Sequence, residues 1–419
     1  MSVVNGYRCV ACAGTQPAEF GGYLCPHCGG NLDINYDYAG AVSRIDDEGF
    51  GVNTDGMFGF APLLPVECTG SFPLKVGATP LYPATRLGRS LGLNRLYFKD
   101  ETVNPSASTK DRASAVVLRR ALELDVTTVA TASTGNAASS MACMAAGLGL
   151  HAVVFVPEKV PAAKLAQLLC FGAQVLAVRG NYDAAFDLCL EACAEFGWYN
   201  RSTGLNPFTR EGKKTCSYEI WEDLGRQAPD WIVVPTGDGN LASGIWKGWR
   251  DLRAAGLVDR LPGIVCAQSE NSAAISLTSR RVVESGESGD WSRVVLAEVN
   301  ASTVADSISV DRPRDGLAAV RAVVESSGLA VTVSDEEILQ AIPEIARSTG
   351  LFLEPSAAVS WVAVRHLVQN QQVGDNDRVI CLASGSGLKD IPSAQRAAGA
   401  PLVIDPDIQS LRRALAGRQ

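Results

Sequence analysis

The sequence lacks both a long apolar run and an excess of positive charge. No stretch approaches the roughly 20 apolar residues that a membrane-spanning helix needs. Lysine and arginine together number 37, against 45 aspartates and glutamates, which gives a formal net charge of -8. We therefore expect neither a nucleic acid nor a membrane as partner, because nucleic acids and anionic membranes attract basic surfaces. An anionic substrate stays compatible with this balance, since a few local cations decide whether it binds.

A secretion signal and an internal repeat are missing as well. The first residues, MSVVNGYRCVACAG, have neither the basic start nor the long apolar stretch of a signal peptide, so we expect a cytoplasmic location. The 419 residues are too many for one small core and predict two or three structural units. Hydrophobic residues make up 47% and charged residues 20%, values typical of a globular protein with a well-buried core.

The 12 cysteines are distributed unevenly, which argues against a disulfide framework. Cys9 and Cys12 form one CxxC pair, Cys25 and Cys28 form a second, and twelve residues separate the pairs. This spacing predicts a zinc ribbon, in which four thiolates surround one structural Zn²⁺. Two alternatives are reduced surface cysteines at a chance spacing and a redox CxxC motif, although no βαβ pattern surrounds these pairs. The other eight cysteines lie in apolar or helical contexts, as buried reduced thiols do.

Short β-branched runs alternate with amphipathic stretches over most of the chain. This alternation predicts an α/β fold with largely parallel sheets that helices cover on both faces. The runs predicted as strands are TTVATA, HAVVFVP, AQVLAVRG, DWIVVPTG, GIVCAQS and RVICLASG. The stretches predicted as helices are DRASAVVLRRALEL, AASSMACMAAGLGL, AAKLAQLLCFGA, YDAAFDLCLEACAEFG and SAAVSWVAVRHLVQ. The polar region 279–315 has no clear pattern, so the sequence does not place its elements.

The run NPSASTKDRAS puts Lys110 at a junction between a loop and a helix. A lysine in that position suits an enzyme that holds the aldehyde cofactor pyridoxal 5′-phosphate (PLP) as a Schiff base, and the same amine can later move a Cα proton. The run STGN follows and opens a second helix, where hydroxyl and backbone N–H groups can hold a carboxylate. Its residues are Ser133, Thr134, Gly135 and Asn136, the last placed to contact the cofactor ring hydroxyl. Taken alone, the lysine reads as a solvated side chain and STGN as an N-cap.

Two later glycine-containing turns complete the pattern. PTGDGN follows a predicted strand and precedes a helix, so that its amides can converge on a phosphate. The residues concerned are Gly237, Asp238, Gly239 and Asn240. LASGSGLKD places Ser384 after an apolar strand, where its hydroxyl can bond a pyridine nitrogen. Each turn alone is more typical of a simple structural turn, and the order and spacing of all four segments carry the prediction.

From about Gly77 to Pro392 the sequence resembles the threonine synthase family of fold type II PLP enzymes, which have a tryptophan synthase beta-like fold. Further segments that carry the resemblance are GATPLYPATRLG, EKVPAAKLAQLLCFGAQVLAVRGNYDAA, LNPFTREGKKT, WKGW, VSDEEILQA and GLFLEPSAA. The resemblance implies PLP on Lys110, a ring contact from Asn136, a phosphate site at 237–240 and a contact from Ser384 to the ring nitrogen. It also implies a homodimer with two domains and a cleft between them. The expected division is a zinc ribbon (1–45), a large PLP-binding domain (46–104 and 210–419) and a small inserted α/β domain (105–209).

The family reaction converts O-phosphohomoserine and water to threonine and phosphate, so a second phosphate must be held beside that of the cofactor. The cations expected to hold it are Arg112, Arg210 and Lys214. Each of the three, taken alone, is more often an ion-paired or surface residue.

The sequence departs from the family pattern close to the substrate. ASTKD stands where the family usually has GSFKD, NPFTR moves the arginine of NPxR by one position, and GDGN adds a carboxylate near a phosphate. An alternative is therefore a related enzyme that eliminates or replaces a β-substituent on another phospho- or acyl-amino acid. A third hypothesis, from a different class, is a zinc-ribbon binding protein whose PLP-like domain no longer binds the cofactor. Absorbance of the bound cofactor and release of phosphate from defined substrates distinguish the three hypotheses.

Overall fold

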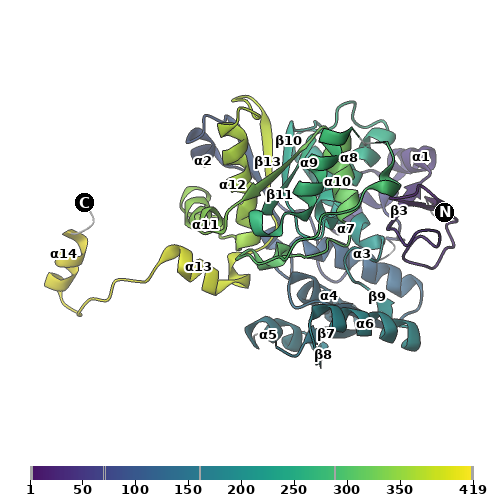
Figure 1. Cartoon of the computed structure of the whole chain (residues 1–419), viewed down its shortest axis with the longest axis horizontal. Helices are drawn as coiled ribbons and strands as arrows, with labels where there is room; N and C mark the ends of the chain where they lie inside the picture. The colour runs from purple at the N-terminus through teal and green to yellow at the C-terminus, as the bar shows by residue number, and fades with distance from the viewer. Residues whose placement is uncertain (1–2, 69, 71, 160–161, 287–288, 417–419) are drawn as a thin grey trace.

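Three β-sheets organise the part of the chain that the structure, a computed structural model, describes (Figure 1). That part is every residue except 1–2, 69, 71, 160–161, 287–288 and 417–419. All six predicted strands are present, within β6, β7, β8, β10, β11 and β13, and the five predicted helices are α3, α4, α5, α6 and α12. The prediction of an α/β fold is therefore confirmed, whereas the domain boundaries stay a prediction.

The largest sheet has the strand order β12-β11-β10-β13-β5-β4. All its pairings are parallel except that of β4 with β5. Its strands are β4 (Leu81–Pro83), β5 (Arg95–Asp100), β10 (Trp231–Pro235), β11 (Gly263–Ser269), β12 (Leu329–Val333) and β13 (Arg378–Ala383).

Alternate residues of this sheet enter two different cores. In β10, Ile232 and Val234 pack in the core that includes helices α7, α8 and α10, whereas Val233 packs in the core that includes α11 and α12. A strand that is buried on both faces reads as a continuous apolar run, which is why WIVVP was recognisable as a strand. Helices thus cover both faces of the sheet (Figure 1).

A second sheet is parallel throughout, with the order β8-β7-β6-β9. Its strands are β6 (Thr128–Ala132), β7 (His151–Pro157), β8 (Gln174–Val178) and β9 (Tyr199–Asn200). Val154 packs in the same large core as α3 and α4, and Phe155, the next residue, packs against α6 on the opposite face. Because successive residues of a strand point to opposite faces, the apolar run HAVVFVP packs against helices on both faces of this sheet too.

The third sheet is small and antiparallel and lies near the N-terminus, with the order β2-β1-β3. Its strands are β1 (Val4–Cys9), β2 (Thr15–Gln16) and β3 (Leu32–Tyr36), and α1 (Tyr38–Glu48) follows. Ile34 and Tyr36 are buried in the same core as Trp249 of α8, so this sheet packs directly on the body of the protein. The helices of the body are α2 (Thr85–Arg89), α3 (Lys110–Glu123), α4 (Asn136–Leu148), α5 (Ala162–Cys170), α6 (Tyr182–Phe196), α7 (Phe208–Asp223), α8 (Asn240–Ala254), α9 (Ala274–Ser285), α10 (Gly316–Glu325), α11 (Asp335–Thr349), α12 (Pro355–Gln369) and α13 (Ile391–Ala398).

Helices α3 and α7 cross at very short range. A Cβ atom on Gly212 would lie 2.0 Å from the carbonyl oxygen of Arg112 and 2.8 Å from Cα of Ala113. Only glycine allows this approach, because any side chain would overlap with the backbone of α3. The crossing fixes the start of α3, and with it Lys110, against α7.

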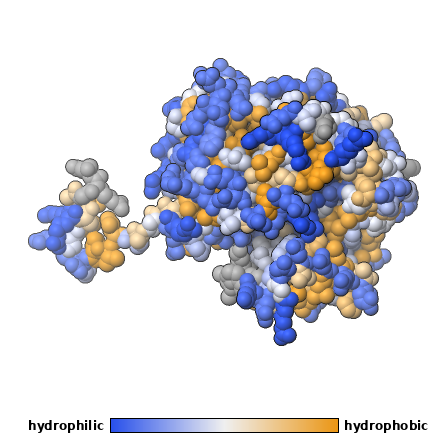
Figure 2. Space-filling model, in the orientation of Figure 1, coloured by the Kyte–Doolittle hydropathy of each residue, from blue (hydrophilic) through white to orange (hydrophobic). Residues whose placement is uncertain are grey.

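The last helix, α14 (Ile408–Ala416), lies at the end of an arm that leaves the body after α13 (Figure 1). Every residue from Gly399 to Gln409 is exposed. The apolar residues of α14 are gathered on one side and its charged residues on another, as Figure 2 shows. Among the described residues, no helix is both long and apolar enough to cross a membrane.

Candidate active site

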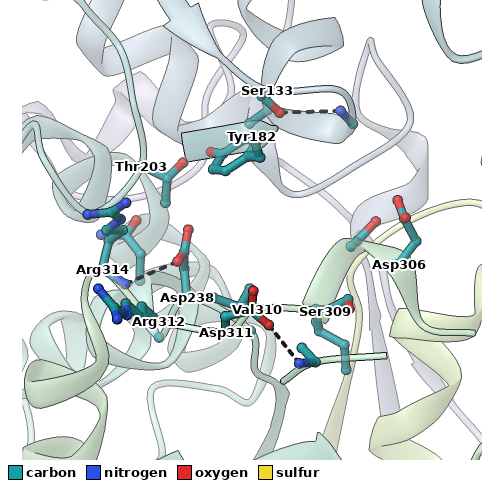
Figure 3. Close-up of a pocket in the computed structure, with 18 of the residues that line it drawn as sticks. Ser133, Tyr182, Thr203, Asp238, Asp306, Ser309, Val310, Asp311, Arg312 and Arg314 are labelled. Atoms are coloured by element: carbon teal, nitrogen blue, oxygen red, sulfur yellow. Dashed lines mark hydrogen bonds between the residues drawn. The ribbon is translucent and has the colours of Figure 1, made fainter. Parts of the chain in front are cut away.

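A cavity of about 860 Å³ opens between the two parallel sheets. Its walls come from the loops that follow β6 and β10, from residues 181–183, from α7 and from the irregular segment 298–314. In Figure 3, Tyr182 and Thr203 lie on one side of the opening, Arg314 and Asp238 on the next, and Asp306 and Ser309 opposite. The cavity thus lies at the carboxyl ends of parallel strands, where α/β proteins place their ligands.

Lys110 is the first residue of α3 and lines the cavity. No carboxylate within the described part of the chain lies at ion-pair distance from its amine. Burial lowers the pKa of Lys110 below its ordinary value, and Arg201 lowers it further, while Glu354 acts in the opposite direction. The Lys110 amine therefore loses its proton more easily than that of an ordinary lysine, as a base or nucleophile near neutral pH must.

The loop before Lys110 pairs with the loop that carries Ser384. The amide of Thr109 donates to the carbonyl of Ser384 at 2.9 Å, and the amide of Ser386 donates to the carbonyl of Ala107 at 3.1 Å. These bonds bring together two motifs that are far apart in the sequence. Ser384 itself is 3% exposed and lies beneath the lysine loop, outside the residues that line the cavity.

Asn136, the first residue of α4, lies on the cavity wall and is held by a carboxylate that the sequence did not single out. Its Nδ2 donates to both oxygens of Glu354 at 3.0 and 3.1 Å and to the hydroxyl of Ser307 at 3.2 Å. Burial raises the pKa of Glu354, and the bonds from Asn136 oppose this rise. The motif GLFLEPSAA contains Glu354, but nothing in the sequence shows that its side chain reaches Asn136.

All four residues of GDGN line the cavity. Gly239 has φ +91°, a left-handed conformation that favours glycine, and a Cβ on Gly237 would lie 2.7 Å from Cα of Ile308. Asp238 accepts the backbone amide of Arg314 at 3.1 Å, and burial raises the pKa of its carboxyl group. The carboxylate that this loop carries is therefore less readily ionised than a solvated one.

Helices α4 and α8 both begin at the cavity without a side-chain cap. The residue before each helix is a glycine, Gly135 and Gly239, and neither helix start has a side-chain hydrogen bond. The first backbone N–H groups of a helix have no partner within the helix, so an uncapped start offers donors to an anion. The cavity contains two such starts, and Ser133 and Thr134 stand beside the first.

The prediction that Arg112 holds a substrate phosphate is not supported. Its side chain is fully buried and forms ion pairs of 2.7 Å with both Glu101 and Glu219. Burial would lower the pKa of Arg112, but these two carboxylates raise it well above its ordinary value. Because both sides of the guanidinium are already occupied, Arg112 joins the turn after β5 to α3 and α7 instead of facing the cavity.

Arg210 and Lys214 are likewise ion-paired within the body of the protein. Arg210 pairs with Asp33 at 2.9 Å and with Asp315, and Lys214 pairs with Glu211 at 2.5 Å and Asp251 at 2.7 Å. Neither lines the cavity. A sequence shows where cations stand but not which carboxylates approach them in space, and here Asp33, Asp251 and Asp315 come from distant segments.

Lys213 is a cation on α7 that does line the cavity, although no motif in the sequence indicated it. It is 1% exposed, and its amine donates to Oδ1 of Asn240 at 2.6 Å. Burial holds the pKa of Lys213 well below its ordinary value, and the charges of Lys110 and Arg201 lower it further. Arg201 is also fully buried, with bonds to Ser114 and to the hydroxyl of Thr203 at 2.7 Å, and burial lowers its pKa to about 10.

Two more arginines reach the cavity from the segment whose elements the sequence did not place. Arg314 lies 3.4 Å from Asp183, with its guanidinium over the ring of Phe186, and Arg312 lies 3.4 Å from Glu298. The run DRPRD was visible in the sequence as a cluster of charge. Its place at the cavity depends on the fold and could not be inferred from that pattern.

The four N-terminal cysteines converge at a separate place. The sulfur atoms of Cys9, Cys12, Cys25 and Cys28 all lie within 4.8 Å of one another. The closest pairs are Cys9 with Cys28 at 3.5 Å and Cys12 with Cys25 at 3.7 Å. This arrangement suits four thiolates around one metal ion.

Similar proteins point to the same chemistry as the cavity. A family model described as "Pyridoxal-phosphate dependent enzyme" matches residues 73–385. The chain is 36% identical over 412 residues to a threonine synthase of Methanosarcina acetivorans, covering 98% of each protein. It is 35% identical over 410 residues to a threonine synthase of Methanocaldococcus jannaschii, covering 97% of this chain and 98% of that protein. The fold resembles the processed form of threonine deaminase isoform 2 from Solanum lycopersicum, with a TM-score of 0.66 at 21% identity over 84% of this chain and 95% of that one.

Proposed function

We propose that this chain, which belongs to the threonine synthase family of pyridoxal-phosphate-dependent enzymes, converts O-phosphohomoserine and water to threonine and phosphate. The observation that carries the proposal is the match to threonine synthases over 98% of the chain, with Lys110 on the wall of a cavity that has two uncapped helix starts. The family accounts for the cofactor, and the two helix starts account for the cofactor phosphate and the substrate carboxylate.

The residues around Lys110 fit pyridoxal phosphate. The hydroxyls of Ser108 and Thr109 are buried without a hydrogen-bond partner, directly before the lysine. Buried polar groups are rarely left unpaired, so these two hydroxyls fit a polar group that binds beside them. Lys110 would hold the cofactor, Asn136 its ring hydroxyl, the amides of 237–240 its phosphate and Ser384 its ring nitrogen.

When bound, the cofactor accepts the electron pair released at the substrate Cα and so makes removal of the Cα proton feasible. The residue that takes this proton is Lys110, whose lowered pKa favours the neutral amine. Ser133, Thr134 and the first amides of α4 would bind the substrate carboxylate, which fixes Cα next to that amine.

A second phosphate site replaces the one predicted at Arg112, Arg210 and Lys214. Lys213, Thr203 and Arg314 line the cavity together, and Arg201 supplies charge from behind Thr203. Lys213 has no carboxylate at ion-pair distance among the described residues, unlike its neighbour Lys214. A buried cation without a counter-ion is stabilised by an arriving anion, so we assign the γ-phosphate of the substrate to this group.

The experiment that tests the proposed function compares three substrates. The PLP-loaded protein is incubated with O-phosphohomoserine, O-phosphoserine and O-acetylserine, and amino acids and phosphate are quantified. We expect threonine and phosphate in equal amounts from the first compound alone. Turnover of only the other two would instead identify an enzyme that eliminates or replaces a β-substituent. A protein that binds no PLP would contradict both.

The cysteine cluster is proposed to hold one structural Zn²⁺, which makes the N-terminal segment a zinc ribbon. Four thiolates complete a tetrahedral site and leave no open position for chemistry. Metal analysis of the purified protein should find one zinc per chain, and the variant Cys25→Ser should lose it.

A homodimer is proposed on the basis of the C-terminal arm. Ile408, Leu411 and Leu415 form an exposed apolar stripe on α14, and a helix of 9 residues is marginal in water without a packing partner. The body offers a hollow of about 310 Å³ whose lining includes Tyr82, Pro83, Phe98 and Leu351, together with the polar Asp100 and Thr349.

The charges beside the hollow and before α14 also favour docking of the arm on a second copy. Arg86 and Arg347 are exposed beside the hollow, and Asp405 and Asp407 precede α14. Each of two copies would contribute an arm and a hollow, as a two-fold symmetric dimer requires.

A further inference from the structure

The N-terminal sheet carries a carboxylate that reaches into the body of the protein. Asp33 of β3 accepts a hydrogen bond from Nη1 of Arg210 on α7 at 2.9 Å, and the amine of Lys247 lies 3.6 Å away. The Asp33 side chain is 17% exposed and that of Arg210 is 5% exposed, so water screens their attraction only weakly.

The other side of the Arg210 guanidinium binds Asp315, which is fully buried at the start of α10. Oδ2 of Asp315 also accepts bonds from Nδ2 of Asn240 at 2.9 Å and from the hydroxyl of Ser243 at 2.6 Å. The backbone amide of Asp315 donates to the carbonyl of Asp238 at 2.9 Å. Asp315 therefore holds the 237–240 loop through both its side chain and its backbone.

A continuous set of buried polar contacts thus runs from Asp33 through Arg210 and Asp315 to Asn240. Asn240 is held at its other end by Lys213, which donates to its Oδ1 at 2.6 Å. The side-chain amide of Asn240 is consequently fixed between a carboxylate and an ammonium. Its backbone N–H belongs to the uncapped start of α8.

The geometry of Arg210 shows how a change at Asp33 reaches this loop. Arg210 is bidentate to Asp315: Nη2 donates to Oδ1, and Nε donates a long bond of 3.3 Å to Oδ2, the oxygen that Asn240 and Ser243 share. Asp33 draws Nη1 in another direction. Without the charge of Asp33, Asp315 is left as the carboxylate partner of the guanidinium, so the long Nε bond to Oδ2 shortens as the charge-assisted pair tightens. Nε then competes with Asn240 and Ser243 for Oδ2.

We propose that Asp33 is a positioning residue for the cofactor phosphate loop, so that the N-terminal sheet sets the affinity of the active site for pyridoxal phosphate. The inference rests on the proposed function only in assigning the cofactor phosphate to residues 237–240. It gives the N-terminal segment a role in cofactor binding that a merely stabilising appendage does not have.

The test measures the Kd for PLP of the wild-type full-length protein and of Asp33→Asn, which keeps the shape of the side chain and removes its charge. We expect the Kd to rise about 10-fold, within the range of coupling between two sites of one protein. The matched control is Arg321→Ala, which removes a different contact of the N-terminal segment with the body, the 2.8 Å bond from Arg321 to the carbonyl of Val10. Its Kd for PLP should equal that of the wild type.

A second variant and a second measurement separate positioning from general destabilisation. Asp33→Glu restores the charge and should recover at least half of the lost affinity. Hydrogen exchange without PLP should show faster exchange at residues 237–243 in Asp33→Asn but not in Arg321→Ala.

Each other outcome overturns the inference. An unchanged Kd for PLP in Asp33→Asn refutes the positioning role of Asp33 but leaves the proposed function intact. An equal rise of the Kd in Arg321→Ala also refutes that role, because any loosened contact of the N-terminal segment would then have the same effect. Failure of the wild type to bind PLP refutes both the inference and the proposed function.

Discussion

At the scale of single residues, three lysines on α3 and α7 have different surroundings. Lys214 is neutralised by two carboxylates, whereas Lys213, the preceding residue, faces the cavity with an amide as its hydrogen-bond partner. Lys110 also lines the cavity without a counter-ion among the described residues. Burial without a counter-ion lowers the pKa of both cavity lysines, which suits Lys110 to proton transfer, whereas Lys213 would bind an anion through its protonated form.

Lys110→Ala tests the base. We expect the rate of threonine formation to fall about 100-fold or more, the usual contribution of a positioned acid or base. Borohydride treatment, followed by peptide mapping, should fix PLP to Lys110 in the wild type and to no residue in the variant. Unfolding temperature serves as the control. A variant that is folded, inactive and still labelled at another lysine would contradict the assignment.

Lys213→Met tests the phosphate site. A hydrogen bond to a charged group contributes about 1.5–3 kcal/mol, so we expect KM for O-phosphohomoserine to rise roughly 10- to 100-fold, with a smaller change in kcat. The matched control is Lys214→Met, which should reduce stability because the buried carboxylates of Glu211 and Asp251 each lose an ion-pair partner, without this selective rise in KM.

The pH dependence of the Lys213 site follows from the lowered pKa of its amine. Only the protonated amine attracts phosphate, so KM in the wild type should rise with pH through that lowered pKa, and Lys213→Met should lack this dependence. Between the lowered pKa and the ordinary value of 10.5, the unfolded chain binds more protons than the folded one. The folded protein therefore gains stability as pH rises through this range, because deprotonation removes the cost of burying a charge on Lys213. In the ligand-free protein, Lys213→Met should abolish this pH dependence of the free energy of unfolding.

The residues that could be predicted were those in recognisable motifs. Lys110, Asn136 and the GDGN loop all reach the cavity, as their places at strand and helix junctions suggested. Arg112 and Arg210 lie outside the cavity lining, and the sequence could not show this because their counter-ions lie far away in sequence, Glu219 and Asp315 among them. Ser384 lies at the lysine loop, and its contact to the cofactor stays a prediction.

At the scale of elements, the site depends on where helices begin and how closely they cross. The alternation of strands and helices was readable because each parallel strand is apolar on both faces and each connecting helix carries an apolar stripe. Strand β12, LAVTV, was not among the predicted strands, and four of its five residues are only partly buried. The segment 298–314 has little regular structure, so no periodicity revealed that it lines the cavity.

Gly212→Ala tests the crossing of α3 and α7. A methyl group there would overlap with the carbonyl of Arg112, so the helices must separate, which typically costs about 1–3 kcal/mol in a packed interior. Denaturant unfolding should show this loss, together with weaker PLP binding because the start of α3 moves. Gly21→Ala is the control, since no atom lies within 4 Å of the added carbon. Equal stability of the two variants would refute the close crossing.

At the scale of the whole molecule, all three sheets bear on the cavity. The two parallel sheets form the cavity, and the N-terminal sheet contacts α7 and α8 behind it. The fold class and the family could be predicted from the sequence. The domain boundaries and the role of the N-terminal sheet depend on contacts between distant segments, such as that of Asp33 with Arg210, and the sequence alone does not reveal them.

Leu411→Asp tests the arm as a dimer contact. A carboxylate in the apolar stripe of α14 should oppose burial on a second copy, so light scattering should find a dimer for the wild type and a shift to monomer at micromolar concentration for the variant. Gln409→Asp adds the same charge outside the stripe formed by Ile408, Leu411 and Leu415 and should leave the dimer unchanged. A dimer of unchanged stability in Leu411→Asp would place the interface elsewhere.

The central claim is that the enzyme breaks the bond between carbon and oxygen in O-phosphohomoserine and adds water at Cβ. The most direct measurement runs the reaction in water enriched in a heavy oxygen isotope and determines the mass of both products. The account predicts one heavy oxygen in the hydroxyl group of threonine and none in the released phosphate. Heavy oxygen in the phosphate, with homoserine as the other product, would indicate simple phosphate-ester hydrolysis and contradict the account.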